Sequence, residues 1–417
     1  MQTHSRSHWL GVDTGGTFTD FVYFDGKTVR IHKVLSTPDA PERAILQGIK
    51  ALQISFDGLQ LIHGSTVATN AVLEGKGVKT LYITNTGFAD VLTIGRQARR
   101  ELYNLMPKPN APLIAADYCV EINTRLAANG ELLQALTQSD IDALLIKIDA
   151  LKPQAVAINL LFSFLDNRQE LEIKKHITQR FKNLFVSCSS DVLAEYKEYE
   201  RGMATALNAY VGPLMQGYLN RLNQQLTAKV NLSVLQSSGG TVGAQQAANQ
   251  AVNLLLSGPA GGLKGAQYVA GLSGESQLLS FDMGGTSTDV ALIEGDIKLT
   301  SEGKIGDYPV AVPMVDMHTI GAGGGSIAFV DAGGLLNVGP ASAGAKPGPA
   351  CYALGGTQAT VTDANLVLGR LQADAFLGDG LQLDLVAAKK AIEKIALQIN
   401  ATREETAQGI VRLANEH

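Results

Sequence analysis

The feature that most restricts the fold is a nine-residue stretch that occurs twice. Residues 12–20 read VDTGGTFTD and residues 281–289 read FDMGGTSTD, so six of the nine positions are identical. Apolar runs flank both copies, which predicts two strands joined by a Gly-Gly turn. After the second copy the pattern continues through DIKLTSEG at residues 296–303, which extends the repeat to about 25 residues. We therefore expect two lobes related by duplication.

Both copies have the composition of a phosphate-binding turn. Adjacent glycines leave backbone N–H groups open to an anion, threonine adds a hydroxyl, and aspartate offers a hard oxygen for Mg²⁺. Either copy alone could be a simple hairpin turn, but the repetition favours two corners that hold one polyphosphate from both sides. Asp13 and Asp282 are the predicted catalytic carboxylates. The predicted phosphate contacts are Gly15, Gly16, Thr17 and Thr19, and Gly284, Gly285 and Thr286.

Around the two copies, the sequence alternates predicted strands and helices. Helices are predicted at residues 41–53, 65–77, 137–152, 167–181, 194–226 and from Pro259 to 272, and strands at 59–64, 78–85 and 155–165. Ser139 and Asp140 are the expected cap of one helix, and Pro213 is expected to kink or interrupt another. The alternation indicates an α/β fold with parallel strands, in two domains at 9–186 and 202–417.

Composition narrows the classes of function. The 417 residues include 34 basic and 39 acidic side chains, and the net charge of −5 provides no broad positive field for nucleic acid or an anionic membrane. The most apolar segment, residues 155–165, is shorter than the roughly 20 residues that span a bilayer. Three separate cysteines and an amino terminus without a secretory signal suit a cytoplasmic protein that acts on small molecules.

A second glycine-rich segment, VDMHTIGAGGGS at residues 315–326, supplies further candidates. Asp316 and His318 would point to the same side of an extended chain and could bind one metal ion or one substrate. A lone histidine on a strand is more often structural, and the same alternative applies to His63. The following glycines, Gly323 and Gly324 among them, are expected to line the cleft that holds the cofactor.

Taken together, these stretches resemble a known family. The two corners are similar to the phosphate-1 and phosphate-2 motifs of the superfamily of actin, sugar kinases and seventy-kilodalton heat-shock ATPases. Within it, the chain resembles the hydantoinase and 5-oxoprolinase A-type subunits, which are related to acetone and acetophenone carboxylase subunits. The matching stretches are GVDTGGTFTDFV, HGSTVATNAVLEGKG, EYERGMATALNAYVGP, QSSGGTV, SGPAGGLKGA, SFDMGGTSTDV, DMHTIGAGGGSIA and PASAGAKPGPACY.

The resemblance implies an actin-like ATPase fold of duplicated ribonuclease-H-like lobes, with mixed sheets flanked by helices, that close on ATP and Mg²⁺. It implies ATP-dependent hydrolysis of a cyclic amide, of the hydantoin or 5-oxoproline type, through phosphorylation of the carbonyl oxygen. The alternative chemistry in the family is ATP-dependent carboxylation of a ketone. A B-type hydantoinase subunit is the implied partner.

Members of this family continue past the equivalent of GIVRLANEH into an adenosine motif, whereas this chain ends at His417. The resemblance therefore implies a second lobe that is truncated before the adenosine motif. We expect weak ATP binding in isolation and an uncovered apolar face that favours a homodimer. A small-metabolite kinase on the same fold and a non-catalytic, nucleotide-responsive assembly protein are the alternative functions.

Overall fold

The structure is a computed structural model that describes residues 8–16, 18–37, 39–98, 103–106, 111–226, 229–285, 288–344, 346–374 and 382–416. Its internal contacts divide the chain into two compact units. Unit 1 contains Met1–Gly262 and Lys298–Val315, and unit 2 contains Leu263–Ile297 and Asp316–His417. The lobe boundaries expected from the sequence, 9–186 and 202–417, stay a prediction. In the described ranges, no helix is both long and apolar enough to cross a bilayer.

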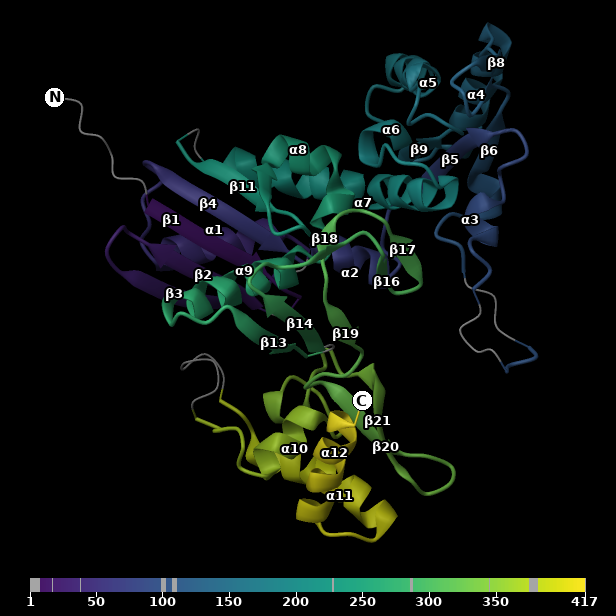
Figure 1. Cartoon of the computed structure of the whole chain (residues 1–417). Coiled ribbons are helices and arrows are strands. Elements are labelled where there is room, and N and C mark those ends of the chain that lie inside the picture. Colours follow the sequence, from purple (N-terminus) through teal and green to yellow (C-terminus); the bar gives the residue numbers. More distant parts are fainter. Residues whose placement is uncertain are drawn as a thin grey trace, which may run out of the picture. The chain divides into compact units, whose positions relative to one another are not determined.

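The first sheet of unit 1 has six strands in the order β12-β11-β4-β1-β2-β3 (Figure 1). They are β1 (His8–Thr14), β2 (Phe18–Phe24), β3 (Val29–Leu35), β4 (Leu59–Ser65), β11 (Asn231–Leu235) and β12 (Thr241–Gly243). The first three form an antiparallel meander, whereas β4 runs parallel to both β1 and β11. Val12 and Phe21 are buried opposite each other, and the ring of Phe21 lies against Gly48 of α1 (Pro41–Ala51).

The second sheet of unit 1 is wholly parallel, in the order β10-β9-β5-β6. Its strands are β5 (Thr80–Asn85), β6 (Cys119–Ile122), β9 (Ala155–Asn159) and β10 (Phe185–Cys188), and α4 (Gln138–Leu151) and α5 (Arg168–Arg180) share an apolar core with it. Thr137 and Asp140 form a capping box on α4, so the helix is capped by Thr137 and not by Ser139. The strand predicted at 155–165 ends at Asn159, and Phe162 has a left-handed backbone with φ of 58°.

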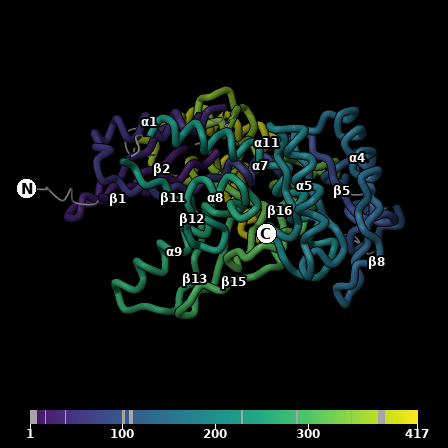
Figure 2. Tube along the Cα trace, turned by 90° about the horizontal axis from the view of Figure 1, so that it is seen from above, coloured from purple at the N-terminus to yellow at the C-terminus, as the bar shows by residue number. Residues whose placement is uncertain are grey.

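The longest helix, α7 (Glu198–Gln225), packs against β9 and β10 and also against α1 and α2 (Val67–Leu73). Figures 1 and 2 both show it between the two sheets of unit 1. The helix continues through Pro213, so it is not interrupted there, whereas the alternative of a kink stays a prediction. Proline removes one helical hydrogen bond, but Val211 and Met215 on either side are fully buried and hold the helix in place. Shorter elements complete this part of the unit: α3 (Val91–Ile94), α6 (Ser189–Val192), α8 (Ala244–Asn249), β7 (Arg125–Leu126) and β8 (Leu132–Gln134).

Unit 2 contains a three-stranded sheet, a hairpin and a helical layer. The sheet has the order β13-β14-β19, with β13 (Gln277–Met283), β14 (Thr288–Glu294) and β19 (His318–Ile320). β20 (Ser326–Val330) pairs with β21 (Leu336–Ser342), and their inner residues share a core with α10 (Val361–Val367), α11 (Leu385–Ile399) and α12 (Arg403–Asn415). The helix predicted after Pro259 begins two residues earlier, as α9 (Ser257–Leu272), and crosses the division between the units.

The chain leaves unit 2 after β14 and returns to unit 1 for residues 298–315. This segment forms β15 (Leu299–Thr300), β16 (Gly303–Ile305), β17 (Tyr308–Val310) and β18 (Met314–Val315), in which β15 pairs with β18 and β16 with β17. Val310, Val312 and Met314 are buried in the core of unit 1. The interpretation of residues 296–303 as the third strand of the repeat is therefore wrong, because β19 takes that place beside β14.

The two copies of the repeat nevertheless have the same strand pairing. In unit 1, Asp13 stands opposite Asp20 across the β1–β2 pair. In unit 2, Asp282 stands opposite Asp289 across the β13–β14 pair. Each turn therefore connects the two strands of an antiparallel pair, and the register of the two pairs is the same, as the repeated sequence predicts. The expected α/β class, with sheets flanked by helices, is confirmed.

Candidate functional site

The first corner is held closed by its own backbone and by two hydroxyl groups. The N–H of Gly15 donates to the carbonyl of Phe18 at 2.9 Å, and Ser36 Oγ donates to the carbonyl of Gly15 at 2.8 Å. Thr19 is fully buried, and its hydroxyl shares a 3.0 Å hydrogen bond with that of Ser36. Gly15 and Thr19 thus shape the turn, whereas Gly16 is exposed at its tip. Thr17 lies outside the described residues.

The carboxylate of Asp13 lies close to two segments that are distant from β1 in sequence. A Cβ atom placed on Gly64, at the end of β4, would be 3.2 Å from Asp13 Oδ1, and one on Gly258, in the first turn of α9, would be 3.5 Å from it. A helix N-terminus favours a negative charge. Thr66 fixes the neighbouring strand end, since its N–H donates to the carbonyl of Thr14 at 3.0 Å. Sequence reasoning did not assign Gly64 or Gly258 to the site, although both lie in the stretches HGSTVATN and SGPAGG.

The second corner carries two carboxylates, Asp282 and Asp289. Burial raises the pKa of Asp289, and the neighbouring Asp282 charge adds to this shift, although the Thr319 hydroxyl donates to Asp289 Oδ1 at 2.6 Å and opposes it. In unit 1 the corresponding Asp20 instead pairs with the ammonium of Lys33 at 2.7 Å. The second corner therefore keeps more negative charge than the first. Two hard carboxylate groups suit a divalent cation such as Mg²⁺.

The glycine run at residues 321–325 packs directly on this second corner. The N–H of Gly324 donates to the carbonyl of Gly284 at 2.9 Å, and that of Gly325 donates to the carbonyl of Gly285 at 2.7 Å. The structure thus brings the predicted residues Gly284, Gly285 and Gly324 together. The carbonyls of Gly284 and Gly285 accept the N–H groups of Gly324 and Gly325. Gly324 therefore supports the backbone of the second corner. Gly323 is buried beside it, with its N–H donating to Ser326 Oγ at 2.9 Å, and Thr286 lies outside the described residues.

Close packing at Gly325 gives a testable expectation. A Cβ there would lie 2.7 Å from the carbonyl oxygen of Gly285 and 2.9 Å from Ser342 Oγ. We expect Gly325→Ala to lower the stability of unit 2 by about 1–3 kcal/mol, as overpacking does, and to loosen the second corner. Thermal unfolding and amide hydrogen exchange at residues 282–285 measure both effects. Gly321→Ala is the matched control, because a Cβ there meets nothing within 4 Å; equal behaviour of the two variants would contradict the expectation.

Asp316 and His318 are both exposed and belong to unit 2, where His318 opens β19 opposite Val290. In the part of the chain that the structure describes, no group of three or more His, Cys, Asp or Glu side chains is arranged to hold a metal ion. The assignment of these two residues as metal ligands stays a prediction.

His63 has the surroundings of a structural residue. It is fully buried on β4, and its Nδ1 donates to the carbonyl of Val12 at 3.3 Å, which leaves Nε2 to accept from the Tyr218 hydroxyl at 2.6 Å. Burial lowers the pKa of His63 from 6.5 to about 4, so the ring is neutral at pH 7. Both ring nitrogens are used in holding β4 to β1 and α7.

Because the folded pKa of His63 is depressed, the unfolded chain takes up its proton first as the pH falls. The neutral ring therefore contributes fully to the free energy of unfolding above pH 6.5. This contribution is lost as the pH falls to about 4, and the total loss is roughly 3 kcal/mol. Urea unfolding between pH 4 and 7.5 measures this slope. His63→Gln should flatten it, whereas Tyr218→Phe should retain it because the buried imidazole remains; an unchanged slope in His63→Gln would refute the assignment.

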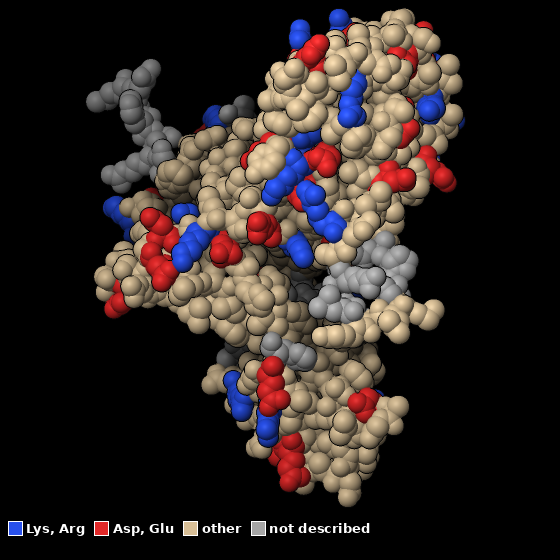
Figure 3. Space-filling model, turned by 45° about the vertical axis from the view of Figure 1, so that its right-hand side comes forward, with Lys and Arg blue, Asp and Glu red and all other residues tan. Residues whose placement is uncertain are grey.

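The two corners belong to different units, and their joint hold on one polyphosphate stays a prediction. Acidic and basic side chains are interspersed over the face shown in Figure 3, in keeping with the small net charge.

Comparisons with known proteins cover most of the chain. Residues 201–417 match the hydantoinase/oxoprolinase family model, and residues 9–181 match the model of the hydantoinase/oxoprolinase N-terminal region. The chain is 33% identical to 5-oxoprolinase 1 of Arabidopsis thaliana over 97% of its own length and 36% of that protein.

Two solved structures share the fold over 98% of this chain. A nucleotide-free acetone carboxylase, from work on ATP-dependent acetone carboxylation, aligns with a TM-score of 0.83 and 25% identity over 61% of that chain. The ATP-dependent caprolactamase of Pseudomonas jessenii aligns with a TM-score of 0.81 and 33% identity over 62% of that chain. This chain thus spans less than two thirds of the length of these relatives.

Proposed function

This chain belongs to the hydantoinase/oxoprolinase family, and we propose that it is an ATP-dependent hydrolase subunit that opens a cyclic amide of the hydantoin or 5-oxoproline type. The observation that carries the proposal is the pair of Asp-x-Gly-Gly corners, built in the same strand register in both units. Relatives named as a 5-oxoprolinase and an ATP-dependent caprolactamase support the reaction class.

The proposed reaction begins with an amide that resists water. Resonance shields the carbonyl, and the ring nitrogen is a poor leaving group. Transfer of the γ-phosphoryl group of ATP to the carbonyl oxygen releases ADP and leaves an activated, imidate-like carbon. Water then attacks this carbon and the C–N bond breaks, which frees the amine and leaves an acyl phosphate. A second water molecule hydrolyses the acyl phosphate to the carboxylate and inorganic phosphate. Catalysis of phosphoryl transfer is largely positioning and charge stabilisation.

In this proposal, each corner has a distinct part. Asp13, close to the first turn of α9, orients the attacking oxygen at the first corner, where Gly16 and Thr17 contact phosphate. At the second corner, Asp282 and Asp289 supply oxygens that suit Mg²⁺, and Gly284, Gly285 and Thr286 contact phosphate. When bound, the cation would neutralise charge on the phosphates. Support comes from the two carboxylates, which stand opposite each other across the β13–β14 pair.

We further propose that a B-type hydantoinase subunit completes the enzyme in the cytoplasm. Support comes from relatives that are named as subunits, the caprolactamase subunit alpha of Pseudomonas jessenii and the acetophenone carboxylase gamma subunit of Aromatoleum aromaticum. ATP-dependent ketone carboxylation is the second candidate, and the fold likeness to acetone carboxylase favours it. A non-catalytic, nucleotide-responsive protein is the reading that remains if no substrate is found.

A phosphate-release assay separates these functions. The chain is incubated with ATP and Mg²⁺, with and without a B-type subunit, in the presence of 5-oxoproline, hydantoin, or acetone with bicarbonate. Stimulation by a cyclic amide supports the hydrolase, and stimulation by acetone with bicarbonate supports the carboxylase. Absence of stimulated release in every combination would overturn both and leave the non-catalytic function.

A further inference from the structure

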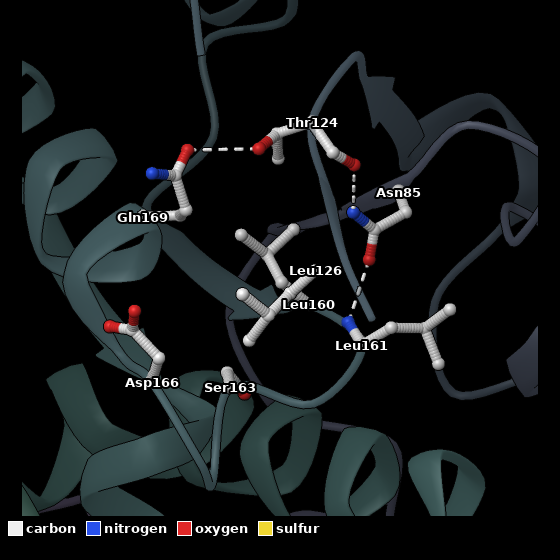
Figure 4. A pocket seen from close by; sticks show the side chains of 8 residues that line it. All are labelled: Asn85, Thr124, Leu126, Leu160, Leu161, Ser163, Asp166 and Gln169. Atoms are coloured by element: carbon white, nitrogen blue, oxygen red, sulfur yellow. Dashed lines mark hydrogen bonds between the residues drawn. The ribbon is translucent and has the colours of Figure 1, made fainter. Parts of the chain in front are cut away.

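The loop that follows β9 borders two hollows of very different size. One, shown in Figure 4, lies between Asn85, Thr124 and Leu161, where the Asn85 side chain links the carbonyl of Thr124 to the N–H of Leu161. Its volume of about 10 Å³ has room for roughly one water molecule. The other, which we call the α7 cavity, lies at the start of α7 and has a volume of about 340 Å³. That is within the range of small-molecule sites, roughly 300–1,000 Å³.

The α7 cavity is lined by a buried cation. Arg201 is only 1% exposed, and its guanidinium donates to Asn159 Oδ1, Ser189 Oγ, and the carbonyls of Glu195 and Leu160. All four acceptors are neutral. A guanidinium has five N–H groups, so one N–H on each of Nη1 and Nη2 has no acceptor among the described residues. The carboxylate of Glu170 is one hydroxyl away, because Ser189 Oγ donates to it at 2.7 Å.

Further positive character comes from the start of α7. Lys197, an exposed lysine at the N-cap, lines the cavity, and its side chain makes no capping hydrogen bond to the first turn of this 28-residue helix, which carries Glu198 and Glu200. The helix dipole favours an anion there. Two other charged side chains, Arg96 and Glu198, line the cavity. Arg96 is paired, since it binds both oxygens of Glu200, and Glu198 contributes one negative charge.

Two phenylalanine rings also line the cavity. Phe162 and Phe164 lie with their ring centroids 6.3 Å apart, and Arg201 stacks over Phe164 at 5.4 Å. Phe162 and Lys197 both have left-handed backbones, with φ of 58° and 70°. Such a conformation is uncommon for residues other than glycine, and here it occurs at two residues that line one cavity. The wall thus combines a cationic end with an apolar, ring-lined side.

We propose that the α7 cavity binds a small organic carboxylate, with the carboxylate against Arg201 and Lys197 and the apolar body against Phe162 and Phe164. The two unclaimed N–H groups of Arg201 match the two oxygens of a carboxylate. A cavity of this size accommodates a single ring with its substituent. This site does not depend on the proposed reaction, because it uses none of the residues of either Asp-x-Gly-Gly corner.

Calorimetric titration of the full chain with benzoate and with benzamide tests the proposal. Benzamide has nearly the same shape but no charge, so we expect it to bind at least tenfold more weakly than benzoate. Lys197→Glu should weaken benzoate at least tenfold, since it reverses the charge of an exposed side chain at the rim. Lys182→Glu, at an exposed position after α5, is the control that makes the same charge change and should leave benzoate binding unaltered.

Phe164→Leu supplies a second, charge-neutral variant, and it should weaken benzoate while leaving the preference for benzoate over benzamide in place. Circular dichroism confirms that each variant is folded. Equal binding of the two probes, an unchanged affinity in Lys197→Glu, or no binding of benzoate at millimolar concentration would each overturn the proposal.

Discussion

Asp13→Asn is expected to lower ATP-dependent phosphate release roughly 10²–10⁴-fold, the usual cost of removing a positioned catalytic group. Asp13 is exposed near the end of β1, while its neighbours Val12 and Thr14 are buried. Asparagine keeps the shape of the side chain but loses the charge and half of the oxygen ligands. The fold should therefore be retained, with a thermal midpoint close to that of the unmodified chain. A phosphate-release assay measures the loss of activity, and circular dichroism during heating measures the thermal midpoint.

The matched control is Asp149→Asn, which makes the same change at an exposed position of α4. It should leave phosphate release unaltered. Asp282→Asn is expected to resemble Asp13→Asn in activity, because both aspartates occupy the same register position of the repeat. Full activity of Asp13→Asn would contradict the catalytic assignment, and loss of the folded state would show that the carboxylate serves the structure.

Arg201→Met is expected to destabilise the protein by roughly 3–5 kcal/mol, the usual cost of breaking a buried charged network. Four acceptors lose their donor, among them the side chain of Asn159, which also donates to the Tyr82 hydroxyl at 2.7 Å. The nearby Glu170 carboxylate, buried and bonded to Ser189 and Ser190, would lose the charge of a neighbouring cation. Urea unfolding followed by circular dichroism measures the loss.

Arg168→Met is the control for this experiment. Arg168 also pairs with a carboxylate, that of Asp166, but its side chain is 79% exposed. An exposed ion pair contributes about 0–1 kcal/mol, so the control should unfold close to the unmodified chain. Comparable losses of unfolding free energy in the two variants would show that the burial of Arg201 does not account for its contribution to stability.

Local features of the fold could be predicted from the sequence. The two corners follow from alternating apolar residues and a Gly-Gly pair, signals that lie within nine residues of each other. The partner strands of each corner could not be predicted in the same way. β19 displaces residues 296–303 from the side of β14 because Val310, Val312 and Met314 find their apolar surroundings in unit 1. That choice depends on packing between distant segments.

The candidate site likewise contains residues that a local motif reveals and residues that only the fold brings together. Asp13 and Asp282 are visible in the repeat, but Gly64 and Gly258 reach Asp13 only because β4 lies beside β1 and α9 begins nearby. Thr319, which binds Asp289, and Ser342, which lies against Gly325, carry no local signal at all. The sequence predicts that the glycine run at residues 321–325 lines the cleft that holds the cofactor. In the structure, the N–H groups of Gly324 and Gly325 donate to carbonyls of the second corner.

The path of the backbone between the units has a consequence for dissecting this protein. The polypeptide passes from one unit to the other three times, at residues 262/263, 297/298 and 315/316. Neither unit can therefore be excised as one uninterrupted fragment. A piece that stops at Gly262 would leave an apolar gap where Val310, Val312 and Met314 belong, and should aggregate. Isolating unit 1 calls for a short artificial linker that joins residue 262 directly to residue 298.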